Sequence, residues 1–388
     1  MDILSFKPRV LVINSARKWI GEAAHTIMLV EGLRSRGIPV VLVCRQGYAM
    51  EDAAEKYNIP CYAIRMKGNF NGIDDLHDLL ALRSIIKKHN IDIIHAHRGK
   101  DHWLSACVRL LPAFRIERPF LIRTRHVTVP VKKHFFNRWL YRKGTDGVIA
   151  VSCAAARSLD GLPLRTPPAV IYSAVDTARF SPGKRSVEMR RELGISDVAP
   201  DAPLVGIVGR IQRVKGQAVF IDAVKRVLEF VPDARFIVAG TGAGELRDSL
   251  QKRAENSSAA HRIRFLGFME DIERLIASMD VGVVASVGSE GSSRIIMEYM
   301  ASGVPVVATC VGGIPEIIEN VRLGWLVEPG NCEKLARGII EALLNRHASQ
   351  EKSALALEKA RAHLSIQRFI NETLCLYQKV MWKTGQQM

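Results

Sequence analysis

The sequence predicts an α/β protein of two doubly wound units, each a parallel sheet covered by helices. An apolar strand at residues 10–13, a loop with Gly21 and a helix ending at Gly37 are followed by a second apolar strand at 39–44. The same order returns in the second half, where the strand LVGIVG precedes the helix FIDAVKRVLEFV. Continuous apolar runs that alternate with helices are typical of parallel strands buried on both faces. A chain of 388 residues is long enough for two such units.

Composition favours a globular protein without a membrane span. Hydrophobic residues make up 48% and charged residues 24% of the chain, as in typical globular domains. No apolar run approaches the roughly 20 residues that cross a bilayer, and the N-terminus lacks a basic-then-apolar signal layout. The seven cysteines are odd in number and lack paired metal-ligand spacing, which is typical of reduced thiols. We therefore expect a cytoplasmic protein.

The positive charge lies mostly in the first half. Residues 1–180 hold 28 Lys and Arg against 15 Asp and Glu, whereas the remainder holds 27 against 24. Such an excess favours an anionic partner, and nucleic acid, an acidic membrane surface and a phosphorylated glycan all fit. Residues 131–143 place aromatic and basic side chains at near-helical spacing, typical of a helix lying on the inner face of an anionic membrane. A core-packed helix with a solvated basic face is equally consistent.

The stretch from Ala285 to Ile318 carries the strongest functional pattern. A strand at 281–285 leads through a glycine turn to a helix that Ser292 or Ser293 can cap. Glu290 precedes this helix, and Glu298 is a lone acid within it. A helix N-terminus favours a phosphate, and nearby carboxylates suit sugar hydroxyls, so the unit fits a sugar nucleotide. In the structural alternative, Glu290 interacts with the helix dipole and Glu298 bonds a neighbouring backbone.

A pair of cations follows the first strand of the second half. Arg210 and Lys215 flank a short loop in GRIQRVKGQ, where two positive charges suit a diphosphate. Two solvated surface cations are the alternative. Further on, Gly240, Gly242 and Gly244 let a backbone approach a nucleotide or simply pack.

Histidines mark two strand ends in the first half. His97 and Arg98 follow the strand at 91–96, and His126 follows the strand at 120–125. Ligands gather at the carboxyl ends of strands in open α/β sheets, which favours a functional role. We expect His95 and His97 to point to opposite faces of the sheet and to form no metal pair. A histidine bonded to a neighbouring loop is the alternative for His126.

These patterns resemble a known family. The spacing Glu290-x7-Glu298, the following A-x-G-x-P-V-V-A and G-G-x-x-E, and Gly-Arg-x4-Lys-Gly around Arg210 are similar to the donor site of retaining glycosyltransferases of the GT-B fold, family 4. The chain departs from the family at Gly291-Ser292-Ser293, where Gly-Phe-Gly is usual. The resemblance implies two Rossmann-like domains facing a cleft: an acceptor domain at 1–180, a donor domain at 181–363 and a helix at 364–388 crossing back onto the first.

The resemblance also implies a function and its residues. The reaction moves a sugar from a nucleotide-sugar donor, with a UDP-sugar favoured, to a saccharide or lipid-linked acceptor, as in lipopolysaccharide core or surface-glycan assembly. No cofactor or metal is required. Catalytic roles go to Glu290, His126, Arg210 and Lys215. The implied donor-binding residues are Gly21, Gly209, Arg210, Lys215, Gly240, Phe268, Met269, Glu290, Gly291, Ser292, Ser293, Arg294 and Glu298. The implied acceptor-side residues are Trp19, His97 and Arg98.

Two other functions remain open. A sugar-nucleotide epimerase or phosphorylase on the same fold would share the donor site. A nucleic-acid binder would explain the positive charge, but the chain lacks aromatics interleaved along a basic groove and any recognised binding module, so no nucleic-acid partner is expected.

Overall fold

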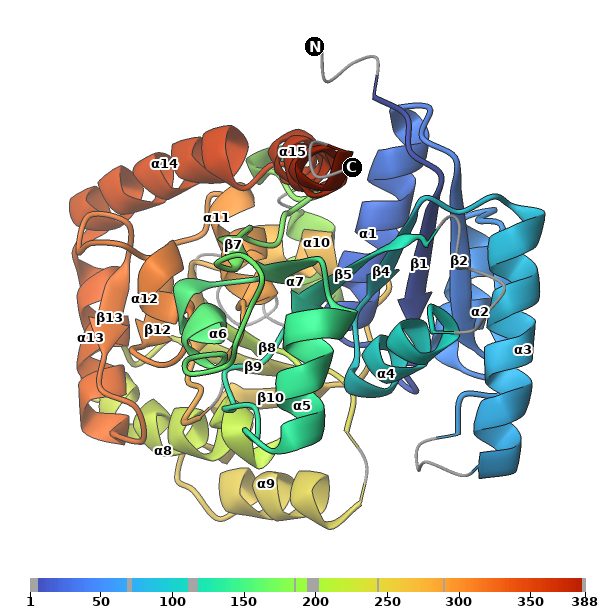
Figure 1. Ribbon diagram of the computed structural model, residues 1–388. Coiled ribbons are helices and arrows are strands. Elements are labelled where there is room, and N and C mark those ends of the chain that lie inside the picture. Colours follow the sequence, from blue (N-terminus) through green and yellow to red (C-terminus); the bar gives the residue numbers. More distant parts are fainter. Residues whose placement is uncertain are drawn as a thin grey trace. The chain divides into compact units, whose positions relative to one another are not determined.

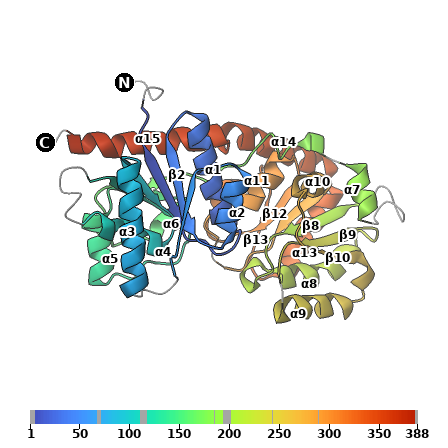
Figure 2. The same ribbon diagram turned by 90° about the vertical axis from the view of Figure 1, so that its right-hand side faces the viewer.

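The computed structural model describes residues 6–67, 72–110, 118–184, 186–193, 202–242, 244–288 and 290–385. The chain forms two compact units (Figures 1 and 2). Unit 1 comprises Met1–Ser173 together with Ile366–Met388, and unit 2 comprises Ala174–Ser365. The chain therefore completes unit 2 before its last helix returns to unit 1.

Unit 1 is built on a parallel sheet in the strand order β3-β2-β1-β4-β5-β6-β7. Its strands are β1 (Val10–Asn14), β2 (Val40–Arg45), β3 (Cys61–Ile64), β4 (Ile93–Ala96), β5 (Phe120–Arg125), β6 (Gly147–Ala150) and β7 (Ala169–Val170). Its helices are α1 (Gly21–Ser35), α2 (Ala49–Lys56), α3 (Gly72–Lys88), α4 (Gly99–Val108), α5 (Phe135–Trp139), a π-helix at Leu140–Gly144, α6 (Cys153–Arg157) and α15 (Ile366–Gly385).

Helices pack on unit 1 because its central strands are apolar throughout. All five residues of β1 are buried, and Leu11 and Ile13 lie in one core with Leu82 and Ile85 of α3. The long helix α15 packs across α1 (Figure 2). At this contact a Cβ on Gly32 would lie 2.4 Å from the Ile370 side chain, so a glycine lets the two helices approach closely.

Unit 2 repeats this plan with the strand order β10-β9-β8-β11-β12-β13, again all parallel. Its strands are β8 (Leu204–Val208), β9 (Arg235–Ala239), β10 (Ile263–Leu266), β11 (Val281–Val284), β12 (Val306–Thr309) and β13 (Trp325–Val327). Its helices are α7 (Val187–Glu192), α8 (Gln217–Leu228), α9 (Glu245–Glu255), α10 (Ile272–Ala277), α11 (Arg294–Ala301), α12 (Ile314–Ile317), α13 (Cys332–Leu344) and α14 (Arg346–His363), with 3₁₀ turns at Pro182–Lys184, Arg213–Lys215 and Ala260–Arg262.

The helix that carries Glu298 is fixed to the sheet by a buried tyrosine. Tyr299 of α11 donates from its hydroxyl to the Gly206 carbonyl at 3.3 Å and accepts from the Val208 amide at 3.1 Å. The Tyr299 ring occupies the space beside Gly282, because a Cβ on Gly282 would lie 2.6 Å from that ring. The start of α11 is thereby held at the carboxyl ends of β8 and β11.

Both sheets confirm the predicted doubly wound α/β class. In each sheet the strand order reverses once, between β1 and β4 in unit 1 and between β8 and β11 in unit 2. Such a reversal leaves a crevice at the carboxyl ends of the two strands, where ligands of open α/β sheets bind. We call these two places the switch point of unit 1 and the switch point of unit 2.

Candidate active site

Two loops form the switch point of unit 2. Residues 209–216 follow β8 and residues 285–293 follow β11, with Ser289 outside the described part of the chain. The amide of Val287 donates to the Val214 carbonyl at 2.9 Å, joining the loops. Gly216 has a φ of +70°, and a Cβ there would lie 1.8 Å from the Ala285 carbonyl oxygen. Only glycine permits this approach, because other residues rarely adopt that φ and carry a Cβ.

The joined loops bring a lysine and a carboxylate into contact. Lys215 Nζ lies 2.5 Å from Glu290 Oε1, and the Ser286 hydroxyl donates to the same oxygen at 2.7 Å. The Ser286 carbonyl in turn accepts from the Thr309 hydroxyl at 2.6 Å. Glu290 is only 6% exposed, so its charge is compensated by Lys215 and Ser286 rather than by water. Sequence patterns indicated Lys215 and Glu290 separately, but not their pairing.

The second predicted cation, Arg210, lies in the same loop. It is half-buried, and burial lowers the pKa of its guanidinium below the usual value. Its side chain donates to Gln212 at 3.2 Å. Behind it, a Cβ on Gly240 would lie 2.1 Å from the Gly209 carbonyl oxygen, so these two predicted glycines allow β8 and β9 to end in close contact. The Gly240 amide donates to the Leu266 and Gly267 carbonyls, which connects Gly240 to the end of β10 and the loop that follows it.

The helix N-terminus differs from the expected serine cap. Ser293 occupies the N-cap position of α11, but its side chain makes no capping hydrogen bond within the described residues, so the prediction of a cap by Ser293 was wrong. The Ser293 backbone, with a φ of −76° and ψ of 84°, departs from the extended conformation common at N-caps. Its hydroxyl oxygen is buried and has no hydrogen-bond partner among the described residues. Buried polar atoms are seldom left unpaired, so this hydroxyl is suited to an external ligand.

Glu298, one turn into α11, is paired within its own helix. Arg294 donates to Glu298 Oε1 at 3.3 Å, an i,i+4 ion pair whose side chains are 17% and 16% exposed. Burial raises the pKa of the Glu298 carboxyl, while Arg294 opposes that shift. The pairing supplies the counter-charge that a lone acid in an apolar helix requires.

The remaining residues predicted to bind the donor lie in the loops after β11 and β10. Gly291 and Ser292 are partly buried beside Glu290, whose carbonyl accepts from the Gly313 amide at 2.9 Å. Phe268 and Met269 follow β10, and Phe268 is 66% exposed. A large aromatic side chain so open to solvent is available to a planar ligand.

The switch point of unit 1 holds the residues predicted for the acceptor side. Trp19 is 41% exposed in the loop after β1, and Gly21 is the first residue of α1. Arg98, the N-cap of α4, lies 3.1 Å from Glu22 of α1. Burial is the main cause that raises the pKa of the Glu22 carboxyl, opposed by Arg98.

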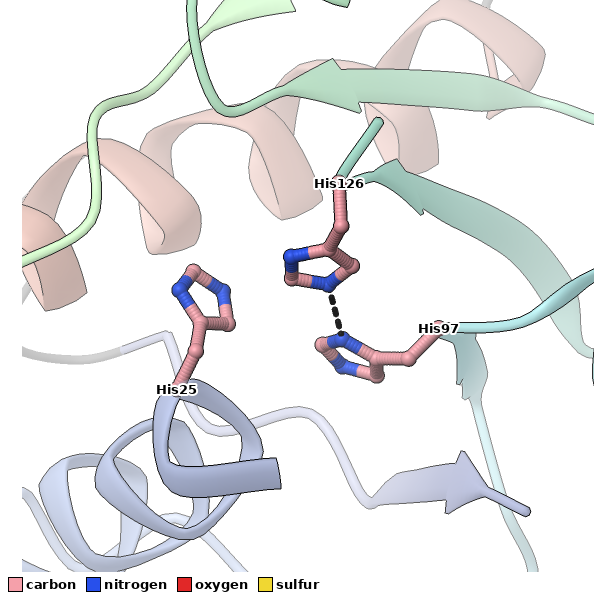
Figure 3. Close-up of side chains that lie close together, drawn as sticks. All are labelled: His25, His97 and His126. Atoms are coloured by element: carbon pink, nitrogen blue, oxygen red, sulfur yellow. Dashed lines mark hydrogen bonds between the residues drawn. The ribbon is translucent and has the colours of Figure 1, made fainter. Parts of the chain in front are cut away.

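Three histidines converge near this switch point (Figure 3). His97 Nδ1 and His126 Nε2 are 3.0 Å apart, and His25 of α1 faces both rings. His25 Nδ1 is 2.8 Å from the Ser173 hydroxyl. Burial lowers the pKa of His97 and of His126 well below the usual value, so both imidazoles are neutral at pH 7. Sequence reasoning missed His25, whose only signal is a polar ring within an apolar helix.

The prediction that His95 and His97 point to opposite faces was wrong. Their rings stack with centroids 4.6 Å apart, because residues two apart along an extended chain point to the same side. Both nitrogens of His95 are engaged, at 2.6 Å each, with the hydroxyls of Tyr377 and Thr124. His95 is therefore part of the buried framework behind His97.

The segment predicted to lie on a membrane is not one amphipathic helix. Helix α5 starts only at Phe135, and Trp139 and Leu140 pack into the core of unit 1. Phe135 and Phe136 remain 75% and 64% exposed. The surrounding basic side chains are all exposed: Lys132, Lys133, Arg138, Arg142 and Lys143. No helix of the described residues is long and apolar enough to cross a membrane.

Comparison with known proteins matches both units. Residues 20–179 match the model of glycosyltransferase family 4, and residues 202–345 match that of the glycosyl transferases group 1. An uncharacterized glycosyltransferase of Methanocaldococcus jannaschii is 32% identical over 83% of this chain and 85% of its own. A lipopolysaccharide core biosynthesis mannosyltransferase of Rhizobium meliloti is 28% identical over 71% of this chain and 78% of its own.

Solved structures match the fold. A glycosyltransferase from Rickettsia africae has a TM-score of 0.86 at 22% identity, covering 97% of this chain and 99% of that one. The Anabaena protein HepE, solved in complex with UDP, has a TM-score of 0.81 at 22% identity, covering 96% of this chain and all of that one. The chain is thus a glycosyltransferase of group 1 and family 4 on the GT-B fold.

Proposed function

We propose that this glycosyltransferase binds a nucleotide sugar, with a UDP-sugar favoured, at the switch point of unit 2. The observation that carries the proposal is the Lys215–Glu290 pair, set beside Arg210 on loops that Gly216 joins. Arg210 and Lys215 hold the diphosphate and neutralise the charge that develops on the leaving nucleotide. The Anabaena structure with UDP supports the choice of base.

For the other donor-side residues we adopt as proposals the roles that the family resemblance implies. The backbone amides of Ser292 and Ser293 and the unpartnered Ser293 hydroxyl bind phosphate oxygens at the start of α11. Glu290 contacts the donor sugar, with Ser286 and Lys215 fixing its carboxylate. For His126 we keep the sugar-contacting role that the family resemblance implies. Glu298 binds the ribose hydroxyls, with Arg294 holding it in place. Gly21, Gly209 and Gly240 keep the backbone close to the donor, and Phe268 and Met269 border the base.

The donor proposal is tested by titration calorimetry with UDP, GDP, ADP and CMP. We expect one diphosphate to bind selectively and Lys215→Ala to abolish that binding. Lys225→Ala, an exposed lysine of α8, is the matched control and should bind as the wild type does. Absence of binding by all four nucleotides contradicts the proposal.

We further propose that the sugar is transferred with retention of the anomeric configuration. Glu290 is not assigned as a nucleophile: the acceptor hydroxyl attacks the face that the nucleotide leaves, and the departing phosphate assists. Proton NMR of the anomeric proton at the newly formed glycosidic bond distinguishes retention from inversion. An inverted product would contradict this mechanism.

The proposed acceptor is a saccharide or lipid-linked saccharide of lipopolysaccharide core or surface-glycan assembly. The relative from Rhizobium meliloti supports this class, as does the positive charge of residues 1–180. Trp19, His97 and Arg98 would lie on the acceptor side. The acceptor-side variant Trp19→Ala should raise the KM for acceptor and leave the donor Kd unchanged.

We also propose a cytoplasmic enzyme held on the inner face of a membrane through residues 131–143. Phe135 and Phe136 are exposed side by side among exposed lysines and arginines, which suits an anionic lipid surface. Flotation with phosphatidylglycerol vesicles should recover the protein at low salt, and phosphatidylcholine vesicles should not. No recovery at low salt removes this part of the proposal.

A second candidate, a sugar-nucleotide epimerase, uses the same donor site. Incubation with the bound nucleotide sugar and no acceptor distinguishes the two, since only an epimerase gives a new nucleotide sugar.

A further inference from the structure

The three histidines of unit 1 form a candidate ligand set, of which the proposed transfer reaction uses only His97 and His126, each for a substrate contact of its own. His25 comes from α1, His97 follows β4 and His126 follows β5, so three separate elements direct their rings to one point (Figure 3). One nitrogen from each ring lies within 4.8 Å of the other two. Among the described residues, this is the only group of three or more His, Cys, Asp or Glu side chains placed closely enough to share an ion.

We propose that His25, His97 and His126 bind one divalent transition-metal ion of the Zn²⁺ type. Neutral imidazole is the ligand form that such ions require, and three histidines with an open fourth position are a known zinc arrangement. Zn–N bonds of about 2.0–2.1 Å place two ligand nitrogens about 3.4 Å apart in a tetrahedron. The His97–His126 pair, at 3.0 Å, is close to that spacing. Since one ligand atom from each of the three residues lies within 4.8 Å of the others, shifts of about 1.4 Å or less bring all three to that spacing.

The partners of the rings favour ligation. The Ser173 hydroxyl lies 2.8 Å from His25 Nδ1, the kind of outer contact that orients metal-binding histidines. His97 Nε2 is buried and has no hydrogen-bond partner among the described residues. It can carry the proton of His97 when Nδ1 binds the ion. His126 then carries its proton on Nδ1, so both rings stay neutral and no proton is released.

Charge around the site is mixed. Arg123 is 5% exposed and close enough to lower the pKa of His97 and of His126, so it acts against a bound cation. The carboxylates of Glu22 and Asp101 interact with Arg123 and offset its charge. His95 is excluded as a ligand because both its nitrogens are hydrogen-bonded.

The test is a titration of the tag-free protein with Co²⁺, which gives visible absorption bands when bound in a tetrahedral nitrogen site. We expect saturation at one ion per chain, displacement by Zn²⁺, and affinity lowered by about tenfold or more in His25→Ala and in His97→Ala. His77→Ala, an exposed histidine of α3, is the matched control and should titrate like the wild type. Circular dichroism verifies that each variant is folded.

Two outcomes would overturn the proposal. One is the absence of saturable Co²⁺ binding by the folded wild type. The other is wild-type affinity in a folded His25→Ala or His97→Ala variant. If a variant does not fold, His25→Gln and His97→Gln, which keep the side-chain volume closer, replace them in the same titration.

Binding would have a consequence for the enzyme, and this step rests on the proposed function. Because His126 is assigned to the donor sugar, an ion on His126 competes with the sugar, so Zn²⁺ should inhibit transfer and EDTA should restore it. Co²⁺ binding without inhibition would contradict only the assignment of His126, whereas absence of transferase activity would leave the metal titration intact.

Discussion

The two switch points share one backbone plan and differ in chemistry. In unit 2 the loops after β8 and β11 carry Arg210, Lys215 and Glu290, so a cation and a carboxylate meet beside a helix N-terminus. In unit 1 the loop after β4 carries the neutral, buried imidazole of His97, and Arg98 pairs with Glu22 of α1. The same strand reversal therefore supports a charged site in one unit and an uncharged cluster in the other. The loops decide the chemistry, while the sheet decides only the place.

The largest expected effect separates the carboxylates of the two switch points. Glu290→Ala should lower kcat by about a hundred- to a thousandfold, because a preorganised group at the donor sugar is lost. Glu22→Ala, which removes a carboxylate paired with Arg98, should keep kcat within about tenfold of the wild type. Steady-state kinetics with saturating donor measure both. A near-normal kcat in Glu290→Ala would contradict the assignment of Glu290 to the donor sugar and the contrast between the two switch points.

A second prediction concerns the contact that joins the loops of unit 2. Gly216→Ala should lower the free energy of unfolding by about 3–4 kcal/mol, because φ is positive and the new Cβ meets the Ala285 carbonyl. Gly330 has a similar φ of +75° but open space around it, so Gly330→Ala should cost only about 1–2 kcal/mol. Urea unfolding measures both losses, and their difference gives the cost of the contact with the Ala285 carbonyl. Equal losses would show that the close approach adds nothing.

A third prediction tests whether the unit 1 cluster is kept neutral. Burial, with His25 and Arg123 adding to it, lowers the pKa of His95 to about 3. The unfolded chain binds a proton at His95 near pH 6.5 and the folded chain does not, so this histidine reduces stability as the pH falls below 6.5. The stability advantage of wild type over His95→Gln should shrink by about 2 kcal/mol between pH 7 and pH 5. A constant difference would mean that His95 takes up its proton as readily in the folded chain as in the unfolded one.

The smallest expected effect concerns the surface of unit 1. Phe135→Ser combined with Phe136→Ser should change the free energy of unfolding by no more than about 0.5 kcal/mol, since both rings are exposed. Vesicle flotation of the same protein should fall sharply. By contrast, Trp139→Ser should destabilise the fold, because Trp139 packs against the core. A strong loss of stability in the double variant would assign the two phenylalanines to packing.

Particular residues show which features could be predicted from the sequence and which could not. The strands could be located from apolar runs, because a parallel strand buried on both faces is built almost entirely of apolar residues. Lys215 and Glu290 were indicated by motifs, whereas the Ser286 hydroxyl on Glu290 carried no sequence signal of its own. The predicted serine cap does not form, because the backbone of Ser293 does not adopt the extended conformation common at N-caps. Within 131–143 the helix begins only at Phe135, and Trp139 and Leu140 pack into the core, as in the core-packed alternative for this segment.

The fold class, the two doubly wound units and the loops that carry the candidate donor residues could all be predicted from the sequence alone. These features depend on local periodicity and on residues close together in the chain. Only the tertiary structure decided which side chains meet: Lys215 with Glu290, Arg294 with Glu298, and His25 with His97 and His126. Residues 25, 97 and 126 come together because α1, β4 and β5 are neighbours in space, and no spacing along the chain encodes that.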